Sequence, residues 1–424
     1  MGVRSDSPPT SDEELSDFGD LEPGLPHPDK PSNSTASTLK KFCLPDRWLA
    51  AVGFGLTVAL ILAVSLGTTV HHPKKLPRPK TGHYPSDAPF REVIHSNFPD
   101  PALLHHNGTW FVYASNNAAG IIHSNLHGQQ KDLGVANVQL ATSKNFLDWE
   151  IQEPAKSPLQ ELPKWVSSEM MASVDTSIAV PRADLWAPDI LRRPDGKFVL
   201  YYSATPADEH SIHCIGASVG NSPKGPFEAE SEPIACHPEE GGTIDTNPFL
   251  DHNDTVYILY KIDGNNRGNG GECLNTVPPL KNTPIYLHKM EKDGTTTSGE
   301  PIKILDRTDS DGPLVEAPSL IRTDEGIYIL FFSTGCTFDP SYTLKYATST
   351  NITGPYTRAK ETLLKTGTHG LYAPGSASIV RDGSKWRMAF HARVFNDDLG
   401  GGIRPMYVAD LEIRDTEVSL VAPE

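Results

Sequence analysis

Residues 317–333 of the chain, APSLIRTDEGIYILFFS, decide the fold. A proline and a short apolar run come first, a Thr-Asp-Glu-Gly turn follows, and a run rich in Tyr, Phe, Ile and Leu ends the stretch. This order is typical of a β-hairpin. Four other stretches repeat it: PDPALLHHNGTWFVYAS (99–115), APDILRRPDGKFVLYYS (187–203), NPFLDHNDTVYILYK (247–261) and APGSASIVRDGSKWRMAFH (373–391).

A hairpin repeated at long intervals predicts a β-propeller. The prolines that open the five units are Pro101, Pro188, Pro248, Pro318 and Pro374. Every interval between them exceeds the roughly 40 residues that a four-stranded blade needs. A β-sandwich or two stacked β domains would also repeat hairpins, but neither explains one proline signature at the start of every unit. We therefore predict an all-β, five-bladed propeller over residues 88–424.

A second signal follows each hairpin and predicts the third strand of each blade with its turn into an outer fourth strand. It combines a β-rich run with a short turn. Three copies are VQLATSKNFLDWE (138–150), IGASVGNSPKGPFE (215–228) and LKYATSTNITGPYT (344–357), and the remaining two units have IYLHKM (285–290) and MYVADLEI (406–413).

The net charge of the chain limits the classes of partner that it can bind. The sequence has 37 basic and 53 acidic residues, a net charge of −16 at neutral pH. Nucleic-acid binding needs basic patches that neutralise phosphates, and none is visible, so we expect no nucleic-acid partner. An acidic balance is compatible with a neutral carbohydrate ligand without indicating one.

The N-terminal part predicts a membrane anchor. Residues 1–47 are rich in Pro, Ser and acidic side chains without an apolar period, so we expect a disordered tail. WLAAVGFGLTVALILAVSLGTTV (48–70) has no charge and is long enough to cross a bilayer as a helix. A buried core helix and a cleaved signal sequence are weaker alternatives, because the run starts far from the N-terminus and a Pro/Lys-rich linker (71–87) follows it.

The orientation of that anchor rests on two features of the propeller, because basic residues flank both ends of the span. Asn107, Asn253 and Asn351 each begin an Asn-X-Thr glycosylation acceptor. Four of the five cysteines also lie in the propeller, a number that suits two disulfides in an oxidising compartment: Cys214, Cys236, Cys273 and Cys336. We predict a single-pass type II membrane protein with a cytoplasmic tail and a luminal or extracellular propeller.

The repeat also predicts where chemistry would occur. The innermost strand of each blade lines the central channel, so the residues around the repeated prolines converge near one end of it. Three carboxylates meet there, Asp100, Asp245 and Glu316. Hydrolysis of a glycosidic bond uses one carboxylic acid to protonate the leaving oxygen and one carboxylate to activate water. Asp189, which follows the second proline, is expected to have a structural role.

The motifs FPDPALL, LWAPDI, IDTNPF and VEAPSL resemble, in order and spacing, those of glycoside hydrolase family 43, over about residues 88–415. The resemblance implies a five-bladed catalytic propeller that cleaves arabinan, arabinoxylan or xylo-oligosaccharides with inversion. It also implies that Asp100 is the general base and Glu316 the general acid, with Asp245 tuning the acid. Inversion would place the Asp100 and Glu316 carboxyls roughly 6.5–9.5 Å apart.

Other positions of the resemblance concern substrate and metal. Trp186 is a candidate platform for a sugar face, and His391 and Arg393 resemble residues of the family's final blade; core packing is the alternative for each. Many arabinan-cleaving members have a histidine after the blade-five glycine, near a bound calcium or other ion. Here Ser376 stands in that place, which argues against a central calcium. We predict no metal ligands and no required cofactor.

Three functions are compatible with this sequence. The first is a glycosidase, with an α-L-arabinofuranosidic bond in a polysaccharide or oligosaccharide as the preferred substrate. The second is a non-catalytic glycan-binding propeller displayed on a membrane, which would not need all three carboxylates. The third is a glycan-processing enzyme of the secretory pathway, although no nucleotide-sugar or Asp-x-Asp motif lies near the channel. We expect a monomer in each case.

The loops around the channel would decide between internal and terminal cleavage. They include residues 116–137, 151–184 and 262–284, and the last contains the Gly/Asn-rich run GNNRGNGGEC. That run is compatible with a flexible rim, a calcium-binding loop or an ordinary loop.

Overall fold

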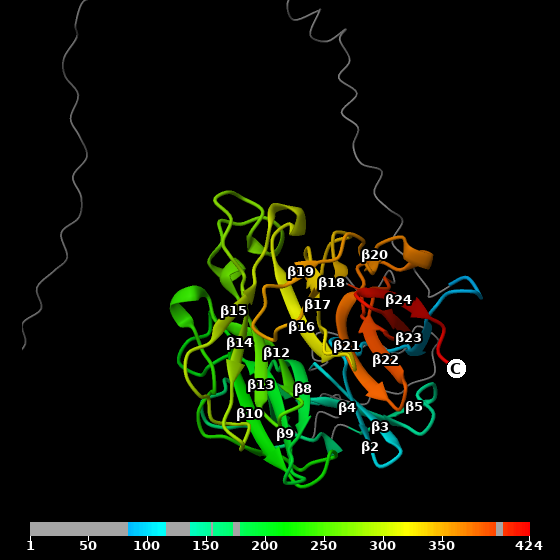
Figure 1. Cartoon of the computed structure of the whole chain (residues 1–424). Coiled ribbons are helices and arrows are strands. Elements are labelled where there is room, and N and C mark those ends of the chain that lie inside the picture. Colours follow the sequence, from blue (N-terminus) through cyan, green and yellow to red (C-terminus); the bar gives the residue numbers. More distant parts are fainter. Residues whose placement is uncertain (1–83, 116–135, 154–155, 173–178, 396–401) are drawn as a thin grey trace, which may run out of the picture. The chain divides into compact units, whose positions relative to one another are not determined.

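The computed structural model of the chain describes residues 84–115, 136–153, 156–172, 179–395 and 402–424 (Figure 1). The predicted tail and span, and the linker up to residue 83, lie outside these residues. Within them, no helix has the length and apolarity to cross a membrane. Packing of the body begins at the end of the predicted linker, where the hydroxyls of Tyr84 and Tyr407 lie 2.5 Å apart.

Most described strands form five antiparallel sheets, each the blade of a propeller (Figure 1). Blade one contains β2 (Ala102–His106), β3 (Thr109–Ala114), β4 (Gln139–Ser143) and β5 (Trp149–Ile151). Blade two contains β8 (Trp186–Arg192), β9 (Phe198–Ala204), β10 (Cys214–Gly220) and β11 (Glu228–Ala229). Blade three contains β12 (Thr243–Leu250), β13 (Val256–Ile262), β14 (Ile285–Lys289) and β15 (Ile302–Leu305).

The last two blades have five strands each. Blade four contains β16 (Val315–Arg322), β17 (Tyr328–Thr334), β18 (Thr343–Ser349), β19 (Thr357–Arg358) and β20 (Leu364–Lys365). Blade five contains β21 (Gly375–Asp382), β22 (Lys385–His391), β23 (Met406–Arg414), β24 (Glu417–Val421) and, from the start of the body, β1 (Arg91–Ile94). The predicted five-bladed all-β propeller is confirmed, with each predicted hairpin and third strand in place.

Several short elements lie in the loops between these strands. One is a two-stranded ribbon of β6 (Glu169–Ala172) and β7 (Ala179–Arg182). The others are 3-10 turns: η3 (Pro238–Glu240), η4 (Gly264–Arg267), η5 (Glu272–Leu274), η6 (Asp309–Asp311) and η7 (Thr368–Gly370).

Strand β1 closes the ring in a way that the repeat does not predict. It pairs with β23 at Met406–Val408, while β24 pairs with the rest of the same edge, so both ends of the body contribute to blade five. The pairing joins residues more than 300 positions apart in sequence, such as Arg91 and Val408. No local pattern in a four-residue strand specifies so distant a partner.

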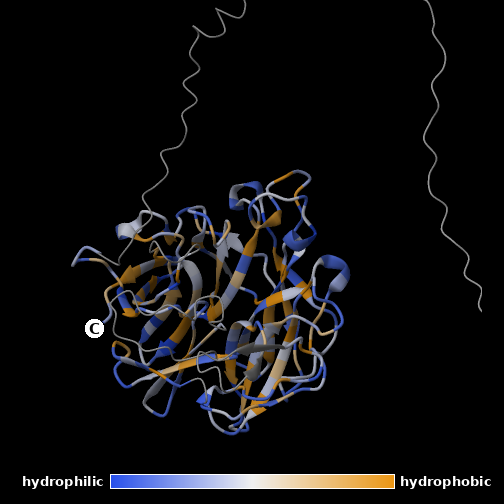
Figure 2. Cartoon of the chain, turned by 180° about the vertical axis from the view of Figure 1, so that it is seen from behind, coloured by the Kyte–Doolittle hydropathy of each residue, from blue (hydrophilic) through white to orange (hydrophobic). Residues whose placement is uncertain are grey.

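The interior of the propeller consists of five apolar clusters, one at each junction between neighbouring blades. At the closing junction, Leu103 and Val112 of blade one pack with Met406 and Val408 of blade five and with Ile94 of β1. Figure 2 shows apolar residues concentrated on the strands and polar residues on the loops between them. Burial of apolar surface between the sheets therefore holds every blade to its two neighbours.

At one position, each blade has a residue with a positive φ, a conformation uncommon outside glycine. The five residues are Asp100 (φ 55°), Ala187 (φ 40°), Asp245 (φ 61°), Ala317 (φ 50°) and Ser376 (φ 52°). In blades two to five, the pairing register of the innermost strand shifts directly after the preceding residue, as in a β-bulge.

The repeated prolines do not all stand at the same place relative to this kink. Pro101, Pro188 and Pro318 directly follow the positive-φ residue of their blades. Pro248 instead pairs with Ile258 inside the strand, and Pro374 precedes its strand. The feature that all blades share is the backbone kink, which the letters of the sequence do not specify.

A ring of hydrogen bonds connects these kinks from blade to blade. The backbone N–H of each positive-φ residue donates to a side chain of the preceding blade. The pairs are Ala187 N to Ser115 Oγ (2.8 Å), Asp245 N to Ser203 Oγ (3.1 Å), Ala317 N to Asp245 Oδ2 (2.9 Å), Ser376 N to Ser333 Oγ (2.8 Å) and Asp100 N to His391 Nδ1 (3.1 Å).

A second ring lies a few residues further along the same strands. Its backbone donors and side-chain acceptors are Leu320 N to Asn247 Oδ1 (2.9 Å), Ile379 N to Ser319 Oγ (3.3 Å) and Leu103 N to Ser378 Oγ (3.0 Å). Between blades two and three, the Asn247 side chain is the donor, from Nδ2 to Asp189 (2.8 Å), and Asp189 also accepts the N–H of Ile190 in its own strand (2.7 Å). Proline is tolerated at 248 because the side chain of Asn247 replaces its missing N–H donor.

Two disulfides are present among the described residues, as the cysteine count predicts. Cys214 pairs with Cys236 next to β10, and Cys273 pairs with Cys336. The second bond joins the loop after β13 to the loop after β17, so it links blades three and four.

Replacing Ser333 by Ala tests the first ring. The substitution leaves the buried N–H of Ser376 without its acceptor, and we expect the free energy of unfolding to fall by about 1–3 kcal/mol. Urea unfolding of the purified protein measures this loss. Ser231→Ala, at an exposed position of blade two, is the control and is expected to change stability by less than about 0.5 kcal/mol. An equally small change for Ser333→Ala would contradict the role of the ring.

Candidate active site

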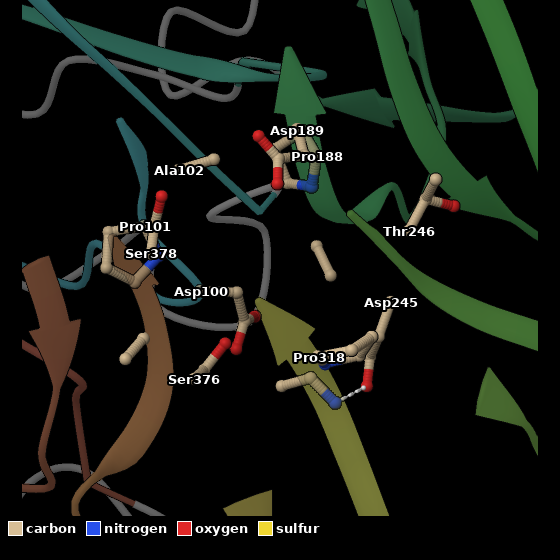
Figure 3. A pocket seen from close by; sticks show the side chains of 13 residues that line it. Asp100, Pro101, Ala102, Pro188, Asp189, Asp245, Thr246, Pro318, Ser376 and Ser378 are labelled. Atoms are coloured by element: carbon tan, nitrogen blue, oxygen red, sulfur yellow. Dashed lines mark hydrogen bonds between the residues drawn. The ribbon is translucent and has the colours of Figure 1, made fainter. Parts of the chain in front are cut away.

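A narrow pocket lies at the centre of the propeller, where the innermost strands of all five blades meet (Figure 3). Its lining includes the positive-φ residue of each blade: Asp100, Ala187, Asp245, Ala317 and Ser376. The structure therefore brings two of the three predicted carboxylates to one pocket. Glu316 precedes the lining residue Ala317, and its side chain is 13% exposed.

Asp100 is held as an anion. Ser115 Oγ donates to its Oδ2 (2.6 Å), and Arg404 Nη1 lies 3.0 Å from Oδ1 and 3.2 Å from Oδ2. Burial alone would raise the pKa of Asp100. The Arg404 guanidinium and the hydroxyls of Ser115 and Ser376 outweigh burial and hold the pKa below its ordinary value. Asp100 is therefore ionised at neutral pH, as a base requires.

Asp245 has the opposite electrostatic environment. Burial and then the neighbouring Glu316 carboxyl raise its pKa well above the ordinary value, and Lys261 only partly offsets this. Its Oδ2 accepts the backbone N–H of Ala317 (2.9 Å; dashed line in Figure 3). Burial and a like charge beside a carboxyl both favour its protonated form. Asp245 therefore holds a proton at a pH where Asp100 has none.

Glu316 is bonded to a buried lysine. Lys261 Nζ lies 3.2 Å from Glu316 Oε2 and 2.9 Å from Asp263 Oδ1, and the lysine side chain is 1% exposed. Burial would lower the pKa of Lys261, but Asp263, Glu316 and Asp245 raise it above its ordinary value. The lysine is therefore a buried cation in direct contact with Glu316, the predicted acid.

Both cations of the site, Lys261 and Arg404, are absent from the residues predicted from the sequence. Lys261 ends the third repeat unit, where the first, second and fourth units end in Ser, so a comparison of the units could have identified it. Arg404 lies before β23 and reaches Asp100 across the closing junction. No repeat pattern includes Arg404, and no local signal could have found it.

His391 and Arg393 do not line the pocket, but they bond to segments that do or that lie beside it. His391 is fully buried, its Nδ1 accepts the N–H of Asp100, and its ring stacks on Tyr342. Burial, followed by the positive charge of Arg404, lowers the His391 pKa to about 3, so the ring is neutral and its proton is on Nε2. Arg393 is also buried, donates to the carbonyl of Thr337 and lies beneath the exposed ring of Phe338 (4.6 Å to its centroid).

Trp186 lies at the start of β8, directly before the lining residue Ala187. It is partly exposed, and its ring stacks on His213 with 3.9 Å between centroids. Asp189 is buried, and burial raises its pKa to about 7. Its two bonds in the second hydrogen-bond ring give Asp189 a structural role, within the blade junction rather than at a turn.

Ser376 stands at the axis, in the place where the resemblance has a histidine near an ion. It is hydrogen-bonded to Asp100, which already pairs with Arg404. Among the described residues, no group of three or more His, Cys, Asp or Glu side chains could hold an ion.

The structure describes the whole of the predicted rim loop 262–284. The Cys273–Cys336 disulfide fixes it to blade four. Asn275 is fully buried and its Nδ2 donates to the carbonyls of Lys281 (3.0 Å) and Pro313 (2.6 Å). Of the other predicted rim loops, residues 116–135 lie outside the described residues.

Known proteins match this arrangement. The family model of glycosyl hydrolases family 43 matches residues 90–415. Xylosidase/arabinosidase 43A of Humicola insolens is 28% identical over 161 residues, which are 38% of this chain and 42% of that protein. Extracellular endo-α-(1->5)-L-arabinanase 2 of Bacillus subtilis (strain 168) is 23% identical over 318 residues, 70% of this chain and 54% of that protein. The chain thus spans about half the length of the curated relatives it matches.

Solved structures agree on the fold. A thermostable family-43 glycoside hydrolase superposes with a TM-score of 0.59 at 22% identity, over 77% of this chain and 94% of that one. The family match covers nearly the whole propeller and includes all three predicted carboxylates. The chain therefore belongs to glycosyl hydrolases family 43.

Proposed function

We propose that the protein is an inverting glycosidase that cleaves arabinose- or xylose-containing polysaccharides or oligosaccharides, with α-L-arabinofuranosidic bonds as the preferred substrate. One observation carries the proposal: the central pocket, or funnel, brings together Asp100, which Arg404 and Ser115 hold as an anion, and Asp245, whose carboxyl burial and the neighbouring Glu316 keep protonated. Glycoside hydrolysis with inversion needs one carboxylate base and one carboxylic acid in the same site at the same pH.

Each carboxyl has one part in the proposed reaction. Asp100 accepts a proton from a water molecule, whose oxygen forms a bond to the anomeric carbon. The bond from that carbon to the leaving oxygen breaks as Glu316 donates its proton to the leaving oxygen. Asp245, which burial and the Glu316 carboxyl keep protonated, lies beside the acid and tunes it. Water attacks the face opposite the leaving group, so the anomeric configuration inverts.

Other residues of the site act through these three. Arg404 keeps Asp100 ionised, and His391 fixes its backbone at the kink. Arg393 holds the Thr337–Phe338 segment at the rim. Trp186 offers a partly exposed ring beside the lining, and an aromatic face suits the apolar face of a sugar.

The names of the two curated relatives support a pentose substrate, because both include arabinose. The fold alone would also suit a non-catalytic glycan-binding propeller, and a membrane anchor would suit a glycan-processing enzyme of the secretory pathway. A lectin has no need for carboxyls with opposed protonation, and this difference favours the hydrolase.

We also propose that the propeller lies in the secretory lumen or outside the cell, attached through residues 48–70 and acting as a monomer. Both disulfides suit an oxidising compartment. All three glycosylation acceptors, Asn107, Asn253 and Asn351, are exposed on the propeller surface.

Replacing Glu316 by Gln tests the acid. We expect the turnover of linear arabinan to fall about 10²–10⁴-fold, because the leaving oxygen loses its proton donor. An aryl arabinofuranoside, an aryl xyloside and linear arabinan are the assay substrates. Glu361→Gln, at an exposed position of blade four, is the control. Absence of turnover by the wild-type protein on all three substrates, or full activity of Glu316→Gln, would sink the proposal.

The stereochemistry of the product tests the pairing of Asp100 with Glu316. Proton NMR during hydrolysis of an α-L-arabinofuranoside should show the β anomer first, before mutarotation equilibrates it. If the α anomer forms first, the reaction retains configuration and Asp100 is not a base acting on water.

Alkaline extraction of membranes and removal of N-glycans test the proposed anchor and compartment. In cells that express the full chain, we expect the protein to remain in membranes after alkaline extraction and to lose mass on enzymatic removal of N-glycans. Replacing Asn107, Asn253 and Asn351 together by Gln is the control and should abolish the mass change. A full-length chain without N-glycans, or one released by alkaline extraction, is incompatible with the proposed anchor and orientation.

A further inference from the structure

Lys261 occupies a position that other blades fill with a hydrogen-bond acceptor. Ser115, Ser203 and Ser333 hold this position in blades one, two and four, and His391 holds it in blade five. An ammonium group has no lone pair and cannot accept the N–H of the next blade. In blade three, the Asp245 carboxylate accepts it instead. The fold alone therefore gives no reason for a lysine here.

The surroundings of Lys261 give a different reason. Its ammonium is buried, and a buried charge persists only with close counter-charges. Asp263 Oδ1 lies 2.9 Å from Nζ and Glu316 Oε2 lies 3.2 Å from it. Asp263 alone could balance the lysine, so the second contact places a cation directly on the proposed acid.

The contact distinguishes the two carboxyls of the acid pair. Lys261 bonds to Glu316, whereas Asp245 bonds to the Ala317 backbone. A cation stabilises the ionised form of the carboxyl that it touches most strongly. In the resting site, the shared proton is therefore favoured on Asp245, beside a Glu316 that the ammonium holds in place.

We propose that Lys261 is the positioning residue of the acid pair: its ammonium fixes the Glu316 carboxyl in the funnel and sets which of Glu316 and Asp245 carries the proton. This inference rests on the proposed glycosidase function. Before the bond to the leaving oxygen breaks, the proton moves from Asp245 to Glu316, which donates it to that oxygen and is left as the carboxylate that Lys261 stabilises. The cation also lowers the pH at which the two carboxyls lose this proton.

Charged and titratable groups from several elements face this cluster. They are Asp245 of β12, Asp263 after β13, Glu316 of β16, Tyr342 before β18, His213 before β10 and, across the funnel, Asp100 of blade one. Burial lowers the pKa of His213, and burial raises that of Tyr342, so both are neutral near pH 7. Lys261 is then the cation in direct contact with the pair.

The test replaces Lys261 by Ser and, separately, by Met. Serine is the residue of three other blades at this position, so it is compatible with the ring. Without the cation, the acid pair keeps its proton to higher pH, and the alkaline limb of the kcat/KM profile should move up by about one to three pH units. The acidic limb, which reports Asp100, should not move, because Arg404 still holds that carboxylate.

Lys345→Met is the matched control. Lys345 Nζ lies 3.0 Å from Asp311 Oδ1 in blade four, so this variant removes a similar ion pair away from the funnel. Both limbs of its pH profile should coincide with those of the wild type. Thermal unfolding of each variant identifies losses of fold. A purely structural lysine would lower the rate of Lys261→Ser at every pH and leave the alkaline limb unmoved, and that result overturns the inference.

Failure of the inference differs from failure of the proposed function. A wild-type protein without glycosidase activity would contradict the proposed function. Carboxyl ¹³C titration of the wild type and of Lys261→Ser would still test the lysine, with the same upward shift expected for the Asp245 and Glu316 pair. Equal titration curves for the two proteins would overturn the inference.

Discussion

Two rings of hydrogen bonds around the central channel are the constraint on which this propeller depends. In the first ring, a backbone N–H of each blade donates to a side chain of the blade before it, from Ser115 and Ala187 round to His391 and Asp100, and three junctions of the second ring repeat this pattern. Apolar surface between the sheets favours five blades packed in a circle, but apolar packing has no direction. The hydrogen bonds fix the register of each blade against the next, because a buried N–H without an acceptor is unfavourable.

The proposed active site is part of the first ring of hydrogen bonds. Asp100 and Asp245 are ring members with positive φ, a conformation that side chains other than glycine rarely adopt. The kink turns their carboxyls toward the channel while their backbone N–H groups hold adjacent blades. Closure of the propeller therefore positions Asp100, the proposed base, together with Asp245, the proposed partner of the acid. The departures from the ring's serine pattern, Lys261 and His391, both lie beside proposed catalytic carboxyls: Lys261 Nζ is 3.2 Å from Glu316 Oε2, and His391 Nδ1 is 3.4 Å from Asp100 Oδ1.

Prediction from sequence succeeded for structure that depends on residues close together in the chain. Each hairpin joins residues a few positions apart, so alternating β-formers and a turn were sufficient to locate β16 and β17 and the other four pairs. Asp100 and Asp245 could be placed in the funnel because the repeat puts them in equivalent positions of different blades. The prolines were a less reliable guide, since Pro248 and Pro374 do not stand at the kink. Arg404 and β1 were out of reach, because their partners are about 300 residues away.

The sequence by itself determined the hairpins, the number of blades and the family motifs, since these depend on patterns within a few residues and on their repetition. Only the tertiary structure decided the protonation of the site. Whether a carboxyl is acid or base depends on its burial and on the charges beside it. For Asp100 the deciding charge is Arg404, from the far end of the chain, and for Asp245 the causes are its burial and the neighbouring Glu316 carboxyl. Those contacts exist only once five sheets close into a ring.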